Sequence, residues 1–283
     1  MEPEKPTCWE TGRAMTERQS TTEAIRRAGW LGVYELFAAK VRDRPDAPAV
    51  RQDELVFSYA AFDERVRRLA AVLAARGIRR GSVVALLSEN RHEYVEVQMA
   101  AARIGAVVAC QNWRLSEAEL AHCIALVAPS LLIVSARHAA KTAGLGLDLP
   151  VIDLDRDYAA LLAAVDPADA PAPAAEPEDP LIVLYTSGTT GLPKGAAISH
   201  RAEIARNQVV RMDIGASRED GFLAWAPMFH MGSTDQLLGA LISGATVHVV
   251  DGFDAGRIVA VMEDHLLGRH PPMPGSIESV VEL

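Results

Sequence analysis

The sequence has 283 residues, of which 49% are hydrophobic and 23% are charged, and its formal net charge is −9. A chain of this length can bury a substantial core without disulfides or metal ions, and it is long enough for roughly one or two domains. The acidic balance argues against a general nucleic-acid-binding protein, although backbone amides can still bind a phosphate locally.

Cysteine content and hydropathy indicate where in the cell the protein is expected. Cys8, Cys110 and Cys123 form neither an even disulfide framework nor a closely spaced pair, which is typical of reduced thiols. The first residues include acids and prolines where a signal peptide needs a basic start and an apolar core, and no apolar run approaches ~18 residues. We therefore expect a cytoplasmic protein without a transmembrane segment.

The N-terminal region changes character near Trp30. Residues 1–28 are polar and without pattern, and we expect a disordered tail there. A helix is expected to follow and to end before Pro45. Its apolar positions, at helical spacing, are Val33, Leu36, Phe37 and Val41. A strand pair is expected at residues 47–50 and 55–57.

Strands and helices then alternate as far as residue 165. Three helices are expected to begin at side chains that can cap them, Ser58, Asn90 and Ser116, the last in a capping box with Glu119. Short apolar runs, typical of strands buried on both faces, lie at residues 83–87, 107–110, 131–134 and 151–154. This alternation predicts parallel strands joined by crossover helices, in a layered α/β fold.

A compositional break divides the chain at residues 166–180. This segment consists of proline, alanine and acidic residues, and it predicts a linker or a long surface loop without chemistry of its own. Beyond it, strands are expected at residues 181–185, 222–226 and 246–250, and helices at residues 199–212, 234–242 and 254–265. We therefore expect two mostly parallel α/β subdomains, at residues 29–165 and 181–283, the second of them incomplete.

The strongest candidate for a functional site is the loop at residues 186–195, which reads TSGTTGLPKG. Glycines allow the backbone to approach an anion closely, hydroxyls add donors, and a lysine supplies positive charge on a long side chain. The loop follows a strand, where α/β folds place ligands. Its candidate phosphate-binding residues are Thr186, Ser187, Gly188, Thr189, Thr190, Gly191 and Lys194. It matches neither a Walker loop nor GxGxxG, and the alternative interpretation is a flexible surface turn.

This loop resembles the phosphate-binding loop of the adenylate-forming (AMP-binding) superfamily, which includes acyl-CoA synthetases, peptide-synthetase adenylation domains and firefly luciferase. Residues 227–232 (PMFHMG) resemble its second motif, whose histidine, here His230, borders the acyl pocket. Residues 112–115 (NWRL) resemble a segment of the acyl-CoA synthetase branch. The resemblance extends over about residues 30–265. Taken alone, His230 could be a structural hydrogen-bonding group, and Trp113 with Arg114 could simply cover a helix start.

The resemblance implies an AMP-forming acid–thiol ligase of the kind found in fatty acid metabolism. A carboxylic acid would be activated with ATP and Mg²⁺ and passed to coenzyme A. The implied catalytic residues are Thr186, Lys194 and His230, and the loop would bind the nucleotide. The remaining histidines, such as His92, His122 and His248, show no ligand spacing, so we assign no metal site. We expect the loop to be exposed and mobile without ligand, and His230 to share its cleft.

Several parts of the superfamily have no counterpart in the sequence. These are its aromatic-Gly-Thr-Glu motif, its ribose-binding aspartate and its C-terminal lysine domain. We therefore expect an N-terminal portion that is inactive without the missing C-terminal portion of the enzyme. The alternatives are an adenylation enzyme that loads a carrier protein and a non-catalytic truncated remnant. The acid, the thiol acceptor, the oligomeric state and whether the natural chain ends at Leu283 stay open.

Overall fold

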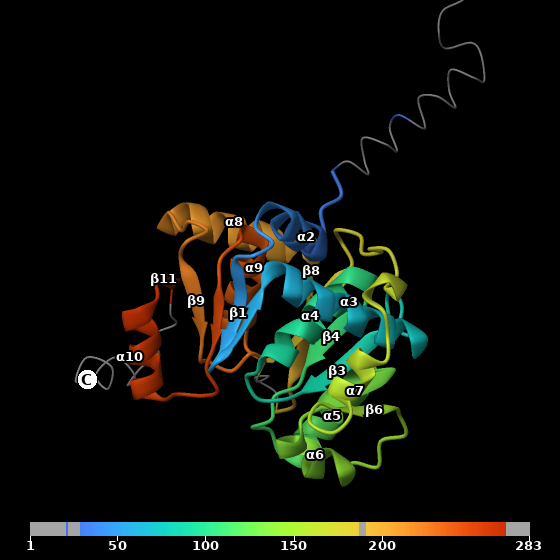
Figure 1. Ribbon diagram of the computed structural model, residues 1–283. Helices are drawn as coiled ribbons and strands as arrows, with labels where there is room; N and C mark the ends of the chain where they lie inside the picture. The colour runs from blue at the N-terminus through green and yellow to red at the C-terminus, as the bar shows by residue number, and fades with distance from the viewer. Residues whose placement is uncertain (1–20, 22–28, 187–190, 270–283) are drawn as a thin grey trace, which may run out of the picture. The chain divides into compact units, whose positions relative to one another are not determined.

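The computed structural model describes Thr21 and residues 29–186 and 191–269 (Figure 1). The chain divides into two units, Met1–Leu31 and Gly32–Leu283. The tail expected at residues 1–28 lies, apart from Thr21, outside the described residues.

The larger sheet of the described chain has six strands in the order β6-β5-β3-β4-β7-β8. They are β3 (Val83–Leu87), β4 (Val107–Cys110), β5 (Leu131–Val134), β6 (Val151–Asp153), β7 (Pro180–Thr186) and β8 (Lys194–Ser199). Neighbours pair in parallel except β7 and β8, which form an antiparallel hairpin. β3, β4 and β5 are almost wholly buried, which explains their uninterrupted apolar runs.

The smaller sheet has five strands in the described chain, in the order β11-β9-β10-β1-β2. They are β1 (Pro48–Gln52), β2 (Leu55–Ser58), β9 (Gly221–Ala224), β10 (Val247–Val249) and β11 (Leu267–Arg269). β1 and β2 are antiparallel, and the other neighbouring pairs are parallel. Both sheets are therefore mixed and mostly parallel, and the predicted α/β fold class is confirmed.

Helices cover the sheets in layers (Figure 1). They are α2 (Val33–Asp43), α3 (Tyr59–Ala75), α4 (His92–Ile104), α5 (Glu117–Val127), α6 (Ala136–Ala143), α7 (Tyr158–Ala163), α8 (His200–Ile214), α9 (Met231–Ser243) and α10 (Ala255–Asp264). The main core lies between the sheets and combines residues of both with residues of α2, α3, α4 and α9. α5 packs through Ile124 on the opposite face of the six-stranded sheet, and α10 packs through Ile258 on the opposite face of the five-stranded sheet.

Two of the three expected helix caps are confirmed and one is wrong. Ser58 caps α3, and Ser116 forms a reciprocal capping box with Glu119; in addition, Ser199 caps α8. Asn90 does not cap α4. That helix begins at His92 after Arg91, which makes no side-chain capping bond. The amide of Asn90 is instead bonded to the backbone of the other sheet.

The two sheets do not divide at residues 166–180. β1 pairs with β10 in one sheet and β4 pairs with β7 in the other, so each sheet combines strands from both sides of this segment. The expected division into one sheet unit at residues 29–165 and another at residues 181–283 is therefore wrong. The segment itself is attached to the fold, because Arg80 forms ion pairs with Glu176 and Asp179.

Candidate active site

The loop at residues 186–195 connects the two strands of the β7–β8 hairpin. The expected strand–loop–helix order is corrected here, because Lys194 and Gly195 belong to β8, and α8 begins only after that strand. Gly191, Leu192 and Lys194 are exposed, as expected. Ser187, Gly188, Thr189 and Thr190 lie outside the described residues, so the mobility of the loop stays a prediction.

Thr186 and Lys194 are directly paired across the hairpin. Directly opposite residues of an antiparallel pair project from the same face, with Cβ atoms roughly 4.5–5.5 Å apart. Because side chains alternate along a strand, this face is the one that Leu184 presents to the core between the sheets. Both residues are exposed. A ligand at this edge would therefore meet a hydroxyl group and an ammonium group on the same side of the hairpin.

Side-chain contacts hold the hairpin at Tyr185 in β7 and at Pro193, which directly precedes β8. The Tyr185 hydroxyl donates to the Cys123 carbonyl at 2.9 Å and accepts from Nε2 of Gln111 at 3.0 Å. Burial raises the pKa of this phenol, so it stays protonated as a donor. A ring nitrogen of His122 lies 3.1 Å from the Pro193 carbonyl oxygen. Sequence reasoning assigned none of these residues to the site, since no local pattern relates positions 62 to 74 residues apart.

A second cluster brings the NWRL and PMFHMG segments together. The Trp113 ring lies edge-on to Phe229, with centroids 5.8 Å apart, and it stacks on His138 at 5.5 Å. The guanidinium of Arg114 lies 5.0 Å from the Trp113 ring centroid. Trp113 and Arg114 therefore contribute to a packed cluster as well as preceding a helix. His138 went unnoticed in the sequence.

His230 lies beside this cluster, at the N-cap of α9. Its ring centroid is 4.5 Å from that of Phe229. Partial burial, and secondly the charge of Arg114, lower the pKa of His230 below its ordinary value. The ring is therefore neutral at pH 7 and can accept a hydrogen bond.

The expected proximity of His230 to the loop rested on adjacent strands. That reasoning is wrong, since His230 follows β9 in the five-stranded sheet and Thr186 ends β7 in the six-stranded one. The two are related through β4 instead. Gln111, which directly follows β4, contacts Tyr185, and Trp113, two residues later, contacts Phe229. The shared cleft stays a prediction, because residues 187–190 lie outside the described chain.

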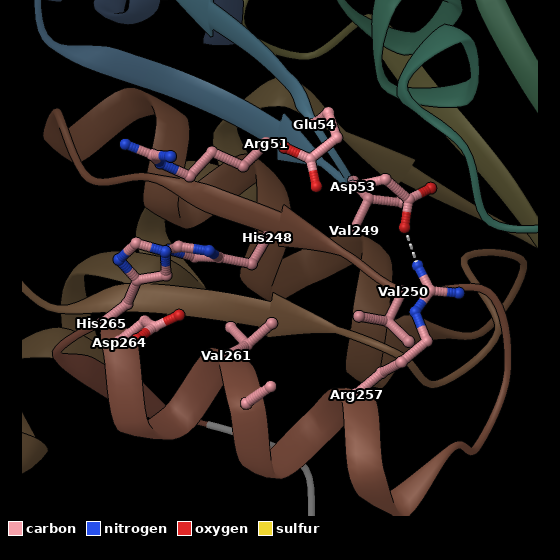
Figure 2. Close-up of a pocket in the computed structure, with 11 residues that line it drawn as sticks. Arg51, Asp53, Glu54, His248, Val249, Val250, Arg257, Val261, Asp264 and His265 are labelled. Atoms are coloured by element: carbon pink, nitrogen blue, oxygen red, sulfur yellow. Dashed lines mark hydrogen bonds and ion pairs between the residues drawn. The ribbon is translucent and has the colours of Figure 1, made fainter.

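A separate cavity of about 270 Å³ lies on the outer face of β1 and β10, against α10 (Figure 2). Figure 2 shows His248 and His265 side by side, with the ion pair of Arg257 and Asp53 at the other end. Burial, then His265, lowers the pKa of His248 to about 4. Acidic and basic groups both line this cavity, so the charge of its lining favours neither an anionic nor a cationic ligand. Thr186, Lys194 and His230 do not line it, and we place the candidate site at the hairpin.

Within residues 29–186 and 191–269 and at Thr21, no group of three or more His, Cys, Asp and Glu side chains could hold a metal ion. In the same part of the chain, no helix has the length and apolarity needed to cross a membrane.

Residues 37–267 match the model of the AMP-binding enzyme family. The chain belongs to this family. It is 34% identical over 248 residues to the indoleacetate–CoA ligase of Aromatoleum aromaticum, which covers 84% of this chain and 48% of the relative. It is also 34% identical over 230 residues to a feruloyl-CoA synthase of an Amycolatopsis species, covering 79% and 45% of the two chains. The chain thus spans about half the length of these curated relatives.

Solved structures agree on the fold. A long-chain-fatty-acid CoA ligase from Rhodopseudomonas palustris has a TM-score of 0.84 at 21% identity, covering 90% of this chain and 66% of that one. A fatty acyl CoA synthetase of Mycobacterium tuberculosis has a TM-score of 0.76 at 25% identity, covering 82% and 47%. The first likeness, at low identity, concerns the fold alone.

Proposed function

We propose that this chain is the nucleotide-binding portion of a ligase that activates a carboxylic acid with ATP and transfers the acyl group to coenzyme A. The observation that carries the proposal is the exposed Thr186–Lys194 pair in a chain of the AMP-binding family. The names of the first relatives, an indoleacetate–CoA ligase and a feruloyl-CoA synthase, support the acid–thiol class.

In the proposed reaction, a carboxylate oxygen attacks the α-phosphorus of ATP. The bond to the pyrophosphate leaving group breaks and gives an acyl-adenylate, whose carbonyl a thiol then attacks to release AMP. Transfer at phosphorus depends chiefly on positioning and on neutralising negative charge. Lys194 would neutralise phosphate charge, while the Thr186 hydroxyl and the loop amides would donate hydrogen bonds. Mg²⁺ would be held largely by phosphate oxygens and water, as this ion prefers.

We propose His230 as a group that borders the reacting carboxyl. Its neutral ring lies against Phe229 and, through it, Trp113. Aromatic faces and edges pack well against flat apolar groups, so these rings favour an aryl acid as the first substrate to test. The acids named in the relatives, indoleacetate, feruloyl and 4-coumarate, point to the same class.

A carrier protein is the second candidate for the thiol acceptor. A fatty acid–[acyl-carrier-protein] ligase of Streptomyces coeruleorubidus is 28% identical over 226 residues, covering 78% of this chain and 44% of that protein. This likeness is weaker than that to the CoA ligases. We therefore keep coenzyme A as the proposed acceptor.

Thioester formation tests the proposal directly. A longer form, supplying the segments that the relatives carry beyond this chain, would be incubated with ATP and Mg²⁺. The acids would be indole-3-acetate, ferulate, 4-coumarate and a fatty acid, each with coenzyme A or a phosphopantetheinylated carrier protein. We expect acid-dependent release of AMP and an acyl-CoA of the corresponding mass. Acyl transfer to the carrier protein alone would favour the second candidate, and no adenylate with any acid would contradict the proposal.

A further inference from the structure

The strongest long-range contact near the site involves Asn90, a buried residue just after β3. Its side chain is 4% exposed. Its Nδ2 lies 3.2 Å from the carbonyl oxygen of Ala224, 2.8 Å from that of Ala226 and 3.2 Å from that of Val250. Its Oδ1 accepts a hydrogen bond from the Met228 amide at 2.9 Å. The amide is oriented unambiguously, because three acceptors surround its nitrogen and a donor faces its oxygen.

These contacts join the carboxyl ends of strands in different sheets. Asn90 follows β3 of the six-stranded sheet, whereas Ala224 ends β9 and Val250 follows β10 of the five-stranded one. The partners are separated from Asn90 by 134 to 160 residues. One side chain therefore links the two sheets at the edge where the candidate site lies.

The same contacts hold the segment that leads to His230. Residues 225–230 run from the end of β9 to the start of α9 without regular secondary structure. Asn90 bonds the Ala226 carbonyl and the Met228 amide, on both sides of Pro227. Phe229 and His230 follow directly, and Phe229 lies against Trp113.

We propose that Asn90 is a positioning residue that sets the backbone of residues 225–230 and thereby orients Phe229 and His230. Its catalytic consequence rests on the function proposed above, but its effect on the segment does not. The competing interpretation is a purely structural role, in which Asn90 fills space and holds the two sheets together.

Hydrogen exchange measured by NMR on the 283-residue chain separates these roles. The Met228 amide reports the segment, and the Ala85 amide, in buried β3, reports global opening. In Asn90→Ala, we expect hydrogen exchange at the Met228 amide to accelerate at least about tenfold more than exchange at the Ala85 amide. A change of this size corresponds to the loss of one net hydrogen bond. The midpoint of the His230 ring titration should also rise, since a released ring would lose the partial burial, and secondly the proximity to the Arg114 charge, that lower its pKa.

Gln52→Ala is the matched control. Its side-chain amide also bonds the backbone, accepting from the His92 amide at 2.7 Å, but it does not contact residues 224–230. This variant should lose stability. The ratio of the exchange rates of the Met228 and Ala85 amides, and the His230 titration, should stay as in the unmodified chain.

Asn90→Leu keeps roughly the volume of the side chain but removes both its donor and its acceptor. We expect it to release Met228 and His230 as Asn90→Ala does, and it serves as the test if Asn90→Ala does not fold. Wild-type exchange and titration in the Leu variant would overturn the proposal. So would equal acceleration of Met228 and Ala85 in Asn90→Ala. Neither readout requires activity, so a failure of the proposed function would be seen separately.

Discussion

At the scale of single residues, the least expected feature is a pair of buried acids between α8 and α9. Glu203 and Asp235 are both fully buried. Nδ2 of Asn207 donates to both, and Nε of Arg206 lies 2.8 Å from Asp235. Burial, and then the charge of Asp235, raise the pKa of Glu203 well above its ordinary value. Glu203 is therefore the protonated member of the pair, because two adjacent buried carboxylates cannot both stay charged.

This pair predicts a pH-dependent stability difference. Unfolded Glu203 releases its proton near pH 4.5, whereas folded Glu203 keeps its proton above that pH. The contribution of Glu203 to the free energy of unfolding therefore falls as the pH rises above this value. Glu203→Gln abolishes this titration while keeping a neutral hydrogen-bonding group. Between pH 5 and 7, the unfolding free energy of Glu203→Gln should rise relative to the unmodified chain by up to about 1.4 kcal/mol per pH unit.

Denaturant unfolding at several pH values measures this difference, with Glu64→Gln as the control. Glu64 pairs with Arg68 on exposed parts of α3, and its substitution should change stability by a constant small amount. A difference between Glu203→Gln and the unmodified chain that does not vary with pH would show that Glu203 is already ionised in the folded chain.

At the scale of elements, local patterns predicted what depends on local chemistry. The capping box at Ser116 and the strands β3, β4 and β5 were confirmed, because hydroxyl caps and uninterrupted apolar runs depend on nearby residues. β8 was missed because its KGAAIS sequence is largely exposed and lacks an apolar run. Asn90 was misassigned because its true partners lie more than 130 residues away.

The β7–β8 hairpin offers a prediction at this scale. Tyr185→Phe removes the hydroxyl that bridges Gln111 and the Cys123 carbonyl, so the buried Gln111 amide nitrogen keeps only its bond to the Ala109 carbonyl and one of its two N–H groups is left unpaired. It should lower the unfolding free energy by about 1–3 kcal/mol and accelerate exchange of the β8 amides. Tyr59→Phe is matched to it, since that hydroxyl is also buried and has two hydrogen-bond partners, the carbonyl groups of Leu241 and Ala245.

Urea unfolding and amide exchange would be measured on both tyrosine variants. Tyr59→Phe should lose comparable stability without specifically accelerating amide exchange in β8. Unchanged β8 exchange in Tyr185→Phe would show that the hairpin does not depend on this bridge.

At the scale of the whole molecule, the order of the strands was beyond sequence reasoning. Uninterrupted apolar runs indicate buried strands, but they do not show which strands pair with one another. Pairing of Val50 with Val247, and of Val108 with Ile182, therefore emerged only in the structure. The family resemblance, by contrast, was already carried by the loop at residues 186–195, and the match over residues 37–267 confirms it.

We predict that the 283-residue chain alone shows no acid-dependent exchange of pyrophosphate into ATP. It spans 48% of the length of the indoleacetate–CoA ligase, and we expect the rest of such a ligase to supply further contacts to the nucleotide. Losing several transition-state contacts together costs tenfold in rate for every ~1.4 kcal/mol. The assay would compare this chain with the longer form and the same acids. Robust exchange by the short chain would show that the chemistry needs less of the family's structure.

The most direct test of the central claim, that the hairpin binds the phosphates of ATP, is pyrophosphate exchange by Lys194→Ala in the longer form. Removing one preorganised charged group from such a site costs on the order of 10²–10³ in rate, and we predict a loss of that size. Thr186→Ala should also lower the rate of pyrophosphate exchange. Arg218→Ala, which breaks an exposed ion pair with Asp43, should stay within about twofold, as expected for a surface pair. Exchange by Lys194→Ala at the rate of the Arg218→Ala control would contradict the account.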